Sequence, residues 1–407
     1  MGLIVQKFGG TSVADADRIR NVARIITDTY KQGNSVVAVL SAQGDTTDDL
    51  IAKAGEINPN ASKREMDMLL STGEQISCAL CAMAIEAMGF PVVSLTGWQA
   101  GVRTNSAYGD ARIKHINGER ILTELDKRSI VIVTGFQGIN KCDDVTTLGR
   151  GGSDTSAVAL AAALHADLCQ IYTDVEGVYT ADPRCVKGAQ KLPEITYDEM
   201  LELATLGAQV LHNRSVEMAK RYNVNLEVLS SFSGKPGTKV KEVVKAMEKT
   251  QVSGVAKDKN IGRLALVGLA DQPGIAFKIF SLLAKNRINV DIILQSIGRG
   301  NTKDISFTVS RPELLRAKTI LEEYRESIGF DHIDVSENIA KVSIVGAGMV
   351  NNPGVASMMF EALYVGGINI QMISTSEIKV SVLVDVTEAD RAVQLIHDRF
   401  FGEHMLG

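Results

Sequence analysis

The first 245 residues alternate between short runs that are apolar throughout and longer stretches in which apolar residues recur every three or four positions. Short apolar runs are typical of strands buried on both faces, and the longer pattern is typical of helices. Strands separated by helices indicate a mainly parallel sheet between two helical layers, a three-layer αβα sandwich. We expect strands at 3–8, 35–41, 91–96, 129–136, 168–173 and 225–230, and helices from Asp15, at 64–88, near Arg120, at 153–165 and in two pieces over 197–222.

A different pattern begins after residue 245, where the chain contains an internal repeat. Residues 271–296 align without gaps with residues 351–376, and nine of the 26 positions are identical. Ordinary composition gives about one or two identities by chance, so the repeat indicates a duplication. Each copy reads as strand, Pro-Gly turn into a helix, strand, strand and helix, which predicts a ferredoxin-like βαββαβ unit.

These patterns set the expected domain boundaries. The sandwich takes residues 1–245, the first small unit 263–337 and the second 338–407. The second unit reaches residue 407 before its last strand. We therefore infer that a strand at 252–257, within a linker of residues 246–262, completes the second unit and that the first unit is inserted within it.

Composition narrows the class of protein. The chain has 407 residues, 45% hydrophobic and 22% charged, which is typical of a globular protein with two or three domains. A net charge of −5 indicates no basic surface for nucleic acid, and the N-terminus has no signal-peptide pattern. No apolar run reaches the ~18 residues of a membrane span, so we expect a cytoplasmic protein without membrane or nucleic-acid partners.

The cysteines and histidines give no metal-binding pattern. Five cysteines and six histidines are scattered without ligand spacing, so no protein metal site is expected. Cys78 and Cys81 lie in an apolar helical stretch, and we interpret them as buried thiols.

Two segments join the end of an expected strand to a helix through paired glycines, a fixed charge and hydroxyl groups. The first glycine loop is residues 7–12 (KFGGTS), and the second is residues 150–156 (RGGSDTS). Glycine lets the backbone approach a phosphate and expose its N–H groups, and a following helix offers the positive end of its dipole. Lys7 and Arg150 add positive charges, while Asp154 has two interpretations, orienting the lysine or capping the helix. Neither loop has Walker A spacing, but together they predict a phosphate site at the carboxyl edge of the sheet.

Further motifs carry a resemblance to a known family. The chain contains KFGGTSVAD at 7–15, SAQGDTTDDL at 41–50, STGEQIS at 71–77, GRGGSDTSA at 149–157 and TDVEGVYTADPR at 173–184, followed by the two repeats. In combination they resemble the aspartokinases, in which a domain of the amino acid kinase fold precedes two ACT domains. The resemblance covers essentially the whole chain. Gln43, where many members have methionine, departs from the pattern beside the substrate loop.

The resemblance implies transfer of the γ-phosphoryl group of ATP to the side-chain carboxylate of L-aspartate, with Mg²⁺ as the counter-ion of ATP, in the first step of lysine, threonine and methionine biosynthesis. A carboxylate is already ionised at neutral pH, so the reaction needs alignment and charge neutralisation rather than a general base. The implied catalytic residues are Lys7 and Asp154; the ATP contacts are Lys7, Phe8, Gly9, Gly10, Ser41, Thr173, Asp174, Tyr179 and Arg184; the aspartate contacts are Thr47, Glu74, Arg150, Gly151, Gly152 and Ser153.

The repeats, by the same resemblance, imply feedback inhibition by lysine, threonine or both. The Pro-Gly turn of each repeat opens a helix whose N-terminus attracts a carboxylate, and a following asparagine can bind a free amino acid. The resemblance also implies a homodimer through the ACT domains, and Met247 is a candidate start for a separately translated regulatory chain in a larger assembly. The implied allosteric residues are Asp271, Gly274, Ile275, Ala276, Asn289 and Gln295 in the first repeat, and Asn351, Gly354, Val355, Asn369, Ser374, Thr375 and Glu377 in the second.

Three alternatives stay open. Another amino acid or nucleotide kinase of the same fold would share the glycine loops without needing the repeats or the Arg150 and Glu74 pair. A non-catalytic amino acid sensor would keep the repeats, although Lys7 and Asp154 are intact. The repeats could also serve only to dimerise an enzyme.

Overall fold

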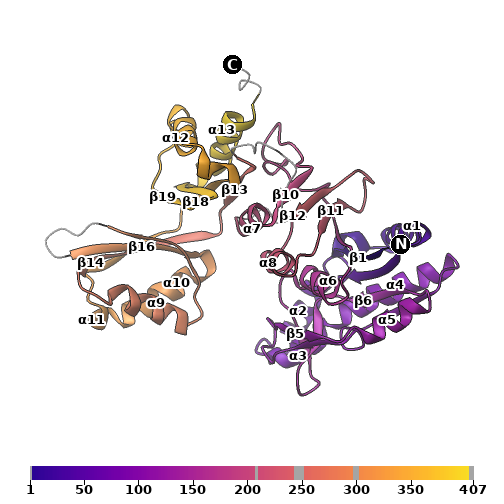
Figure 1. Cartoon of the computed structure of the whole chain (residues 1–407). Coiled ribbons are helices and arrows are strands. Elements are labelled where there is room, and N and C mark those ends of the chain that lie inside the picture. Colours follow the sequence, from indigo (N-terminus) through magenta and orange to yellow (C-terminus); the bar gives the residue numbers. More distant parts are fainter. Residues whose placement is uncertain (1, 207–209, 243–251, 297–301, 403–407) are drawn as a thin grey trace. The chain divides into compact units, whose positions relative to one another are not determined.

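A computed structural model of the chain describes residues 2–206, 210–242, 252–296 and 302–402. The chain forms two compact units (Figure 1). The first comprises Met1–Tyr179 and Gln190–Met247, and the second comprises Thr180–Ala189 and Glu248–Gly407. Met247 and residues 246–251 of the expected linker lie outside the described residues.

The first unit is built on a sheet of eight strands in the order β10-β12-β11-β9-β1-β2-β6-β3. Neighbouring strands are parallel except β11 and β12. All six strands expected from the apolar runs are present to within two residues, whereas β10 and β12 were not expected. The strands are β1 Leu3–Phe8, β2 Ser35–Leu40, β3 Val92–Leu95, β6 Ile130–Thr134, β9 Leu168–Thr173, β10 Glu194–Thr196, β11 Leu226–Ser230 and β12 Thr238–Lys241.

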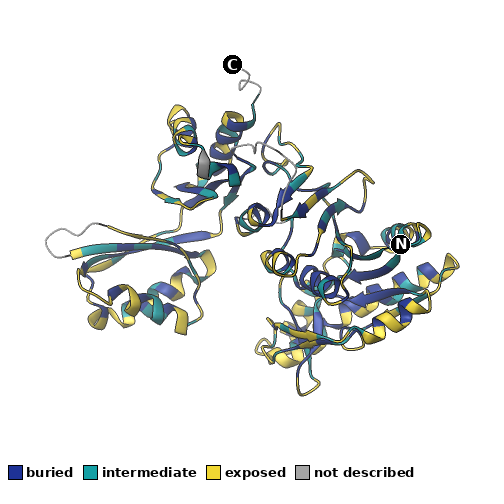
Figure 2. Cartoon of the chain, viewed as in Figure 1, coloured by how far each residue is buried: buried dark blue, intermediate teal, exposed yellow. Residues whose placement is uncertain are grey.

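Helices cover both faces of this sheet, and their buried sides face inward (Figures 1 and 2). α1 and α4 share one core with the sheet, in which Ile26, Cys78 and Ile132 take part. α6 packs against β1 and β2 on the other face and is itself covered by α8, which explains why it has no polar face. The helices are α1 Ala16–Lys31, α2 Thr46–Ile57, α3 Lys63–Leu70, α4 Thr72–Ala87, α5 Glu119–Asp126, α6 Gly152–Ala163, α7 Tyr197–Thr205 and α8 Asn213–Tyr222.

The stretch Lys63–Ala87, which holds α3 and α4, is the one helical stretch of the described residues that is long and apolar enough to cross a membrane. Its residues Glu74 and Ser77 are buried in the protein, and Cys78 and Cys81 are buried free thiols, as the sequence predicted. We therefore interpret α4 as a core helix of the sandwich.

A small second sheet in the first unit has the order β5-β4-β7-β8. Strands of three or four residues are too short for a recognisable pattern, so the sequence did not predict them. This sheet matters because β8 ends just before the second glycine loop. Its strands are β4 Val102–Thr104, β5 Ile113–Ile116, β7 Gln137–Ile139 and β8 Val145–Thr147.

The second unit contains the two repeats, each with a four-stranded antiparallel sheet, in the orders β15-β16-β14-β17 and β13-β18-β20-β19. β13 pairs with β18, so the strand inferred before the first repeat lies in the sheet of the second. The first repeat has β14 Ile261–Ala270, α9 Ile275–Lys285, β15 Val290–Gln295, β16 Thr302–Ser310, α10 Leu314–Glu323, α11 Arg325–Ile328 and β17 His332–Ser336; the second has β13 Gly254–Asp258, β18 Ile339–Val345, α12 Val355–Val365, β19 Met372–Thr375, β20 Lys379–Asp385 and α13 Ala389–Phe401.

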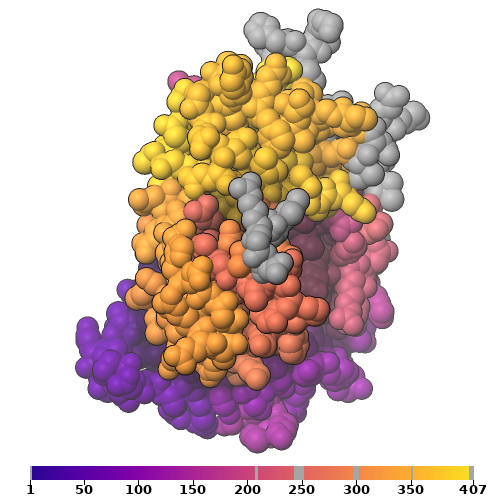
Figure 3. Space-filling model, turned by 90° about the vertical axis from the view of Figure 1, so that its left-hand side faces the viewer, coloured from indigo at the N-terminus to yellow at the C-terminus, as the bar shows by residue number. Residues whose placement is uncertain are grey.

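The two repeats pack on each other within this unit; Figure 3 shows the first in orange beside the second in yellow. Lys341, on a strand of the second repeat, forms an ion pair with Asp291 of the first. A small apolar cluster joins the two sheets and contains Ile261, Ile292, Ile339, Met372 and Leu383.

The segment Thr180–Ala189 belongs to the second unit, although the sequence boundary at residue 245 placed it in the sandwich. Ala181 and Val186 are buried in the core of the second repeat. The Thr180 hydroxyl is hydrogen-bonded to Nε2 of His397, on α13, at 2.8 Å, and both residues are buried. No sequence pattern indicated this packing, because the segment is a short loop far from the repeats in sequence.

Candidate active site

A cavity of about 650 Å³ lies at the C-terminal ends of β1 and β2, and both glycine loops line it. The carboxyl edge of an open parallel sheet is the usual ligand site of such folds. Segments that are far apart in sequence therefore meet at one place, as the sequence predicted. The expected site residues that line the cavity are Lys7, Gly9, Gly10, Ser41, Thr47, Glu74, Arg150, Gly151, Gly152, Ser153 and Asp154.

Lys7 and Asp154 form an ion pair inside this cavity. Nζ of Lys7 lies 2.6 Å from Oδ1 of Asp154, and each side chain is 12% exposed. β1 brings Lys7 to the cavity while the next residue, Phe8, points to the core and stacks on Tyr172. The carboxylate fixes the position of the lysine ammonium at the edge of the sheet. From there the ammonium can donate a charge-assisted hydrogen bond to a phosphoryl oxygen.

The first glycine loop differs from expectation in one respect. Residues Gly10–Val13 form a short 3₁₀ helix, and α1 begins only at Ala16, capped by Asp15. The helix expected from Asp15 is confirmed, but a 3₁₀ turn separates its N-terminus from the two glycines. Gly10 allows the close approach of two backbone segments, because a Cβ on Gly10 would lie 2.8 Å from the carbonyl oxygen of Ala42.

The second glycine loop does open a helix of twelve residues. Gly151 is the N-cap of α6 and has a φ of 66°, a conformation that glycine adopts readily. The N-cap interpretation of Asp154 was wrong, because Asp154 lies in the first turn and pairs with Lys7. The N-terminus of α6 thus presents its dipole to the cavity, where it favours an anion.

Glu74 is a buried carboxylate on α4 at the wall of the cavity. Its Oε1 accepts a hydrogen bond from the backbone N–H of Ala42 at 3.1 Å, and Oε2 has no hydrogen-bond partner among the described residues. Burial raises the pKa of Glu74 to about 7, and the backbone hydrogen bond opposes the shift. A cation that enters the cavity would satisfy Oε2 and restore the charge of Glu74.

Sequence reasoning missed several residues that line the cavity. Asp67, on α3, is buried, and its carboxylate accepts hydrogen bonds from the backbone N–H groups of Gly109 and Thr147 and from the Thr147 hydroxyl. A single acidic residue in a helical pattern gives no signal of such a role. The other missed lining residues are Ala42, Gly44, Asp48, Ile51, Lys63, Met66, Leu70, Gly109, Phe136, Thr147 and Gly149.

Comparison with known proteins identifies the family. Residues 2–230 match the amino acid kinase family, and residues 264–324 and 342–400 match an ACT domain family. The chain is 51% identical over 400 residues to an aspartokinase of Bacillus sp. (strain MGA3), covering 98% of this chain and 97% of that one. It is 50% identical over 400 residues to aspartokinase 2 of Bacillus subtilis (strain 168), with 98% of each chain covered. The chain belongs to the aspartokinase family.

Solved aspartokinase structures have the same fold. E. coli aspartokinase III in complex with aspartate and ADP (R-state) matches with a TM-score of 0.84 and 28% identity, covering 98% of this chain and 100% of that one. The same enzyme in complex with lysine and aspartate (T-state) matches with a TM-score of 0.75, covering 98% and 99%. As an aspartokinase, the chain is a phosphotransferase that combines an amino acid kinase domain with ACT domains.

The remaining nucleotide contacts expected for an aspartokinase lie outside the set that lines the cavity. Thr173 is the last residue of β9 and Asp174 follows it, and the hydroxyl of Thr173 donates a hydrogen bond to Asp174. Tyr179 pairs with Lys191 in an isolated bridge. Arg184 is exposed, forms an ion pair with Asp182 and belongs to the second unit. Phe8, another expected nucleotide contact, is buried in the core and does not line the cavity, so its side chain cannot touch a ligand there. The nucleotide assignments of the other four residues stay predictions.

The expected allosteric residues divide into two groups. Asp271, Ala276, Asn289, Gln295, Asn369, Thr375 and Glu377 are exposed, and Ser374 is half-buried. Ile275 and Val355, which begin α9 and α12, are buried in the cores of their repeats, so they can offer a ligand only backbone groups. Asp271 forms an ion pair with Lys303 at 3.0 Å. Gly274 and Gly354 are the N-caps of the two helices, and the side chain of Asn351 lies outside the described residues.

The described residues contain no cluster of three or more acidic, histidine or cysteine side chains that could hold a metal ion. Mg²⁺ in nucleotide sites usually binds one or two carboxylates together with phosphate oxygens and water. Asp154, in the cavity beside Lys7, is a carboxylate that suits this mode.

Proposed function

We propose that the chain transfers the γ-phosphoryl group of ATP to the β-carboxylate of L-aspartate, giving 4-phospho-L-aspartate. This is the first step of lysine, threonine and methionine biosynthesis. The supporting observation is that one cavity holds both glycine loops together with Lys7, Asp154, Arg150 and Glu74. In this set the cation Lys7 suits phosphate. The cation Arg150 and the anion Glu74 suit the carboxylate and the ammonium of an amino acid.

The residues at the carboxyl edge of the sheet bind the phosphate groups. Lys7 neutralises the transferred phosphoryl group, and the backbone N–H group of Gly10 approaches it because this residue has no side chain. The N–H of Gly9 instead donates to the carbonyl oxygen of Tyr172 at 3.3 Å, so Gly9 contributes room for the phosphate and not a hydrogen bond. Asp154 orients Lys7 and binds the Mg²⁺ of ATP, which supplies further neutralisation of phosphate charge. No proton has to be removed from the nucleophile, because the β-carboxylate is ionised at neutral pH. Catalysis therefore rests on alignment and electrostatics.

Aspartate recognition uses opposite charges on two sides of the cavity. The guanidinium of Arg150 forms a fork that suits the α-carboxylate. Glu74 accepts hydrogen bonds from the ammonium of aspartate. Its Oε2, which has no hydrogen-bond partner among the described residues, would gain one in this way. Thr47 and Ser153 donate hydroxyl hydrogen bonds to the remaining oxygens.

Regulation and assembly belong to the ACT domains. We propose that lysine, threonine or both bind beside the helix N-termini at Gly274 and Gly354 and inhibit the kinase. β15 and β19 lie at edges of the two sheets and leave Ile293 and Ile373 exposed at 50% and 40%. Unpaired edge strands with apolar side chains favour pairing with a second copy, which supports a homodimer through these domains.

An assay with hydroxylamine tests the chemistry. Acyl phosphates react with hydroxylamine to give hydroxamates, so ATP and L-aspartate should give aspartyl hydroxamate together with ADP. L-Glutamate, L-asparagine and the amide-blocked α-carboxyl analogue should react far more slowly. ADP release with no hydroxamate, or a preference for another acceptor, would contradict the proposal and favour another kinase of this fold.

A further inference from the structure

The loop that carries Arg150 is held from two sides by residues that do not belong to any recognised motif. Arg150 lies between Gly149 and Gly151, whose φ angles are 77° and 66°. Two left-handed glycines leave the loop with little stiffness of its own, so neighbouring contacts must set where Arg150 points.

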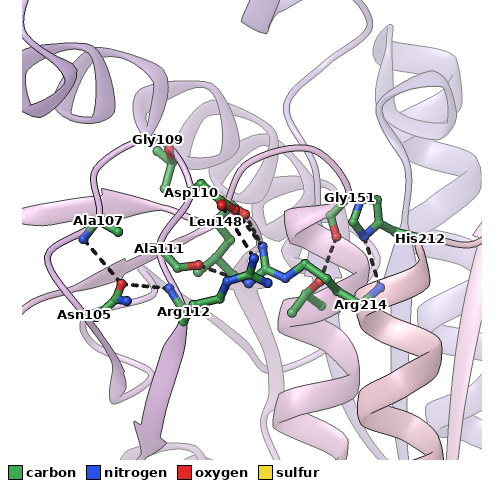
Figure 4. A network of polar contacts seen from close by, with 12 residues as sticks. Asn105, Ala107, Gly109, Asp110, Ala111, Arg112, Leu148, Gly151, His212 and Arg214 are labelled. Carbon is green, nitrogen blue, oxygen red and sulfur yellow. Dashed lines mark hydrogen bonds and ion pairs between the residues drawn. The ribbon is translucent and has the colours of Figure 1, made fainter. Parts of the chain in front are cut away.

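Arg214, in the first turn of α8, supplies the contacts on one side (Figure 4). Its Nη1 donates to the carbonyl oxygen of Leu148 at 2.6 Å, and its Nη2 donates to the carbonyl oxygen of Ala111 at 3.0 Å. Nη1 also lies 3.3 Å from Oδ1 of Asp110. Leu148 and Ala111 are fully buried, so their carbonyl groups depend on protein donors.

Asp67 supplies the contacts on the other side. Its Oδ2 accepts hydrogen bonds from the N–H groups of Gly109 and Thr147, at 3.0 and 2.9 Å. The segments 109–111 and 147–148 are thus fixed between an anion on α3, which accepts from N–H groups, and a cation on α8, which donates to carbonyl groups. Each segment receives a contact from both, and the loop with Arg150 leaves directly from the second one.

His212, at the N-cap of α8, restricts the space beside Gly151. Its Nδ1 accepts from the backbone N–H of Arg214, and its ring lies against Gly151, with Cγ only 2.2 Å from where a Cβ would stand. Figure 4 shows the ring beside Gly151 and the guanidinium of Arg214 directed at Asp110, Ala111 and Leu148. One helix end therefore contacts the loop both before and after Arg150.

We propose that Arg214 is a positioning residue for the acceptor substrate: by binding the carbonyl groups of Leu148 and Ala111 it sets the place from which Arg150 reaches the α-carboxylate. This inference rests on the proposed function of Arg150. Because Arg214 lines no part of the cavity, it acts through the loop and not by touching aspartate.

A double-mutant cycle tests the proposal with the full-length protein. KM for aspartate, KM for ATP and kcat are measured for wild type, Arg214→Ala, Arg150→Ala and the double variant, with melting temperatures for each. Arg221→Ala is the control, because Arg221 is an exposed arginine at the other end of α8. Arg214→Ala should raise KM for aspartate about tenfold and leave KM for ATP within about twofold, since coupled neighbours differ by factors of this size.

The decisive result is the effect of Arg214→Ala when Arg150 is absent. In the Arg150→Ala background it should change KM for aspartate by less than about twofold, because the residue through which it acts is gone. An equal effect in both backgrounds, or an equal rise of KM for ATP and aspartate, overturns the proposal. If Arg150→Ala itself leaves KM for aspartate unchanged, the proposed role of Arg150 fails, and the positioning role of Arg214 falls with it.

Arg214→Lys keeps the cycle informative if the alanine variant does not fold. Lysine retains the positive charge but lacks the two separate nitrogen donors of the guanidinium. It can therefore donate well to the carbonyl oxygen of Leu148 or of Ala111, but not to both. It should raise KM for aspartate by less than alanine does, again only when Arg150 is present. A lysine variant with wild-type KM for aspartate contradicts the proposal.

Discussion

Glu74 shows how a single buried group can link substrate binding to pH. In the ligand-free protein its pKa is raised by burial to about 7 from a usual value of 4.5. The unfolded chain therefore loses the Glu74 proton at lower pH than the folded protein does. Folding stability due to this group is present below pH 4.5 and is lost as the pH rises to about 7, by an amount on the order of 3 kcal/mol.

The first prediction concerns this stability. Unfolding by urea at several pH values should show that Glu74→Gln removes part of the fall in stability of the ligand-free protein between about pH 4.5 and pH 7. The neutral amide cannot titrate, so the difference between variant and wild type should grow with pH across that window. Parallel curves for the two proteins would show that Glu74 titrates normally.

The second prediction concerns binding. In the proposed site the ammonium of aspartate binds ionised Glu74, so KM for aspartate should fall as the pH rises from 6 to 8, with an inflection near 7, while KM for ATP stays nearly constant. Glu74→Gln should abolish the inflection and raise KM for aspartate at every pH. A wild-type KM for aspartate without an inflection in this range would contradict the role of Glu74.

Residue patterns predicted those cavity-lining residues that lie in glycine-rich or hydroxyl-rich segments, such as Lys7 and Arg150. Asp67 and Arg214 could not be found in this way. Each is one charged residue in a helix with an ordinary amphipathic pattern, and its role depends on tertiary contacts with the small second sheet. That sheet was itself missed because its strands have only three or four residues.

Among the elements, the segment Thr180–Ala189 links the two units. It follows directly on Tyr179, a predicted nucleotide contact, and its own residues Ala181 and Val186 are buried in the core of the second repeat. If an amino acid that binds the ACT domains displaces α13, it would therefore also displace the segment that follows Tyr179, a predicted nucleotide contact. The Thr180–His397 hydrogen bond is a buried side-chain contact in this connection, and the carbonyl oxygen of Thr180 also accepts a hydrogen bond from the N–H of Val255 at 2.7 Å.

The third prediction is that Thr180→Val weakens inhibition by lysine or threonine and changes kcat without inhibitor by less than about twofold. Valine leaves Nε2 of His397 buried without this partner, which costs about 1–3 kcal/mol and loosens the segment from α13. Inhibition curves and melting temperatures measure the effect. Thr319→Val is the control, because the hydroxyl of Thr319 is exposed on α10 and bonds only within its helix. Unaltered inhibition in Thr180→Val would show that this segment does not transmit regulation.

At the level of elements, apolar runs were sufficient to predict six of the eight strands of the large sheet, because such runs are typical of strands buried on both faces, whereas the short β10 and β12 were missed. The first glycine loop was harder: the helix expected from Asp15 is present as α1, but no local pattern indicated that Gly10–Val13 form a 3₁₀ turn before it. The difference is set by the close approach of Gly10 to Ala42, which local sequence does not report.

On the scale of the whole molecule, duplication in the sequence was enough to predict two ferredoxin-like units, and the pairing of β13 with β18 agrees with the inferred insertion of one within the other. The shared cluster of Ile261, Ile292, Ile339, Met372 and Leu383 could not be predicted, because its members are isolated apolar residues spread between positions 261 and 383. This packing makes the two ACT domains one structural unit.

The fourth prediction is that lysine, threonine or both stabilise this unit and inhibit the enzyme. A ligand at 100 times its dissociation constant adds about 2.7 kcal/mol to the stability of the state that binds it, so the melting temperature should rise with ligand concentration. Asn369→Ala should weaken both effects and leave kcat without ligand unchanged. Wild-type activity and melting temperature that do not respond to either amino acid, or to both, would mean that the repeats only mediate assembly.

The most direct test of the proposed chemistry is the kcat for aspartyl hydroxamate formation in Lys7→Ala, compared with wild type and with Lys31→Ala, an exposed lysine on α1. Loss of the charge paired with Asp154 should lower kcat by about a hundredfold or more, and melting should show that Lys7→Ala remains folded. Lys31→Ala should match wild type. A folded Lys7→Ala protein that forms aspartyl hydroxamate at the wild-type rate would contradict phosphoryl transfer in this cavity.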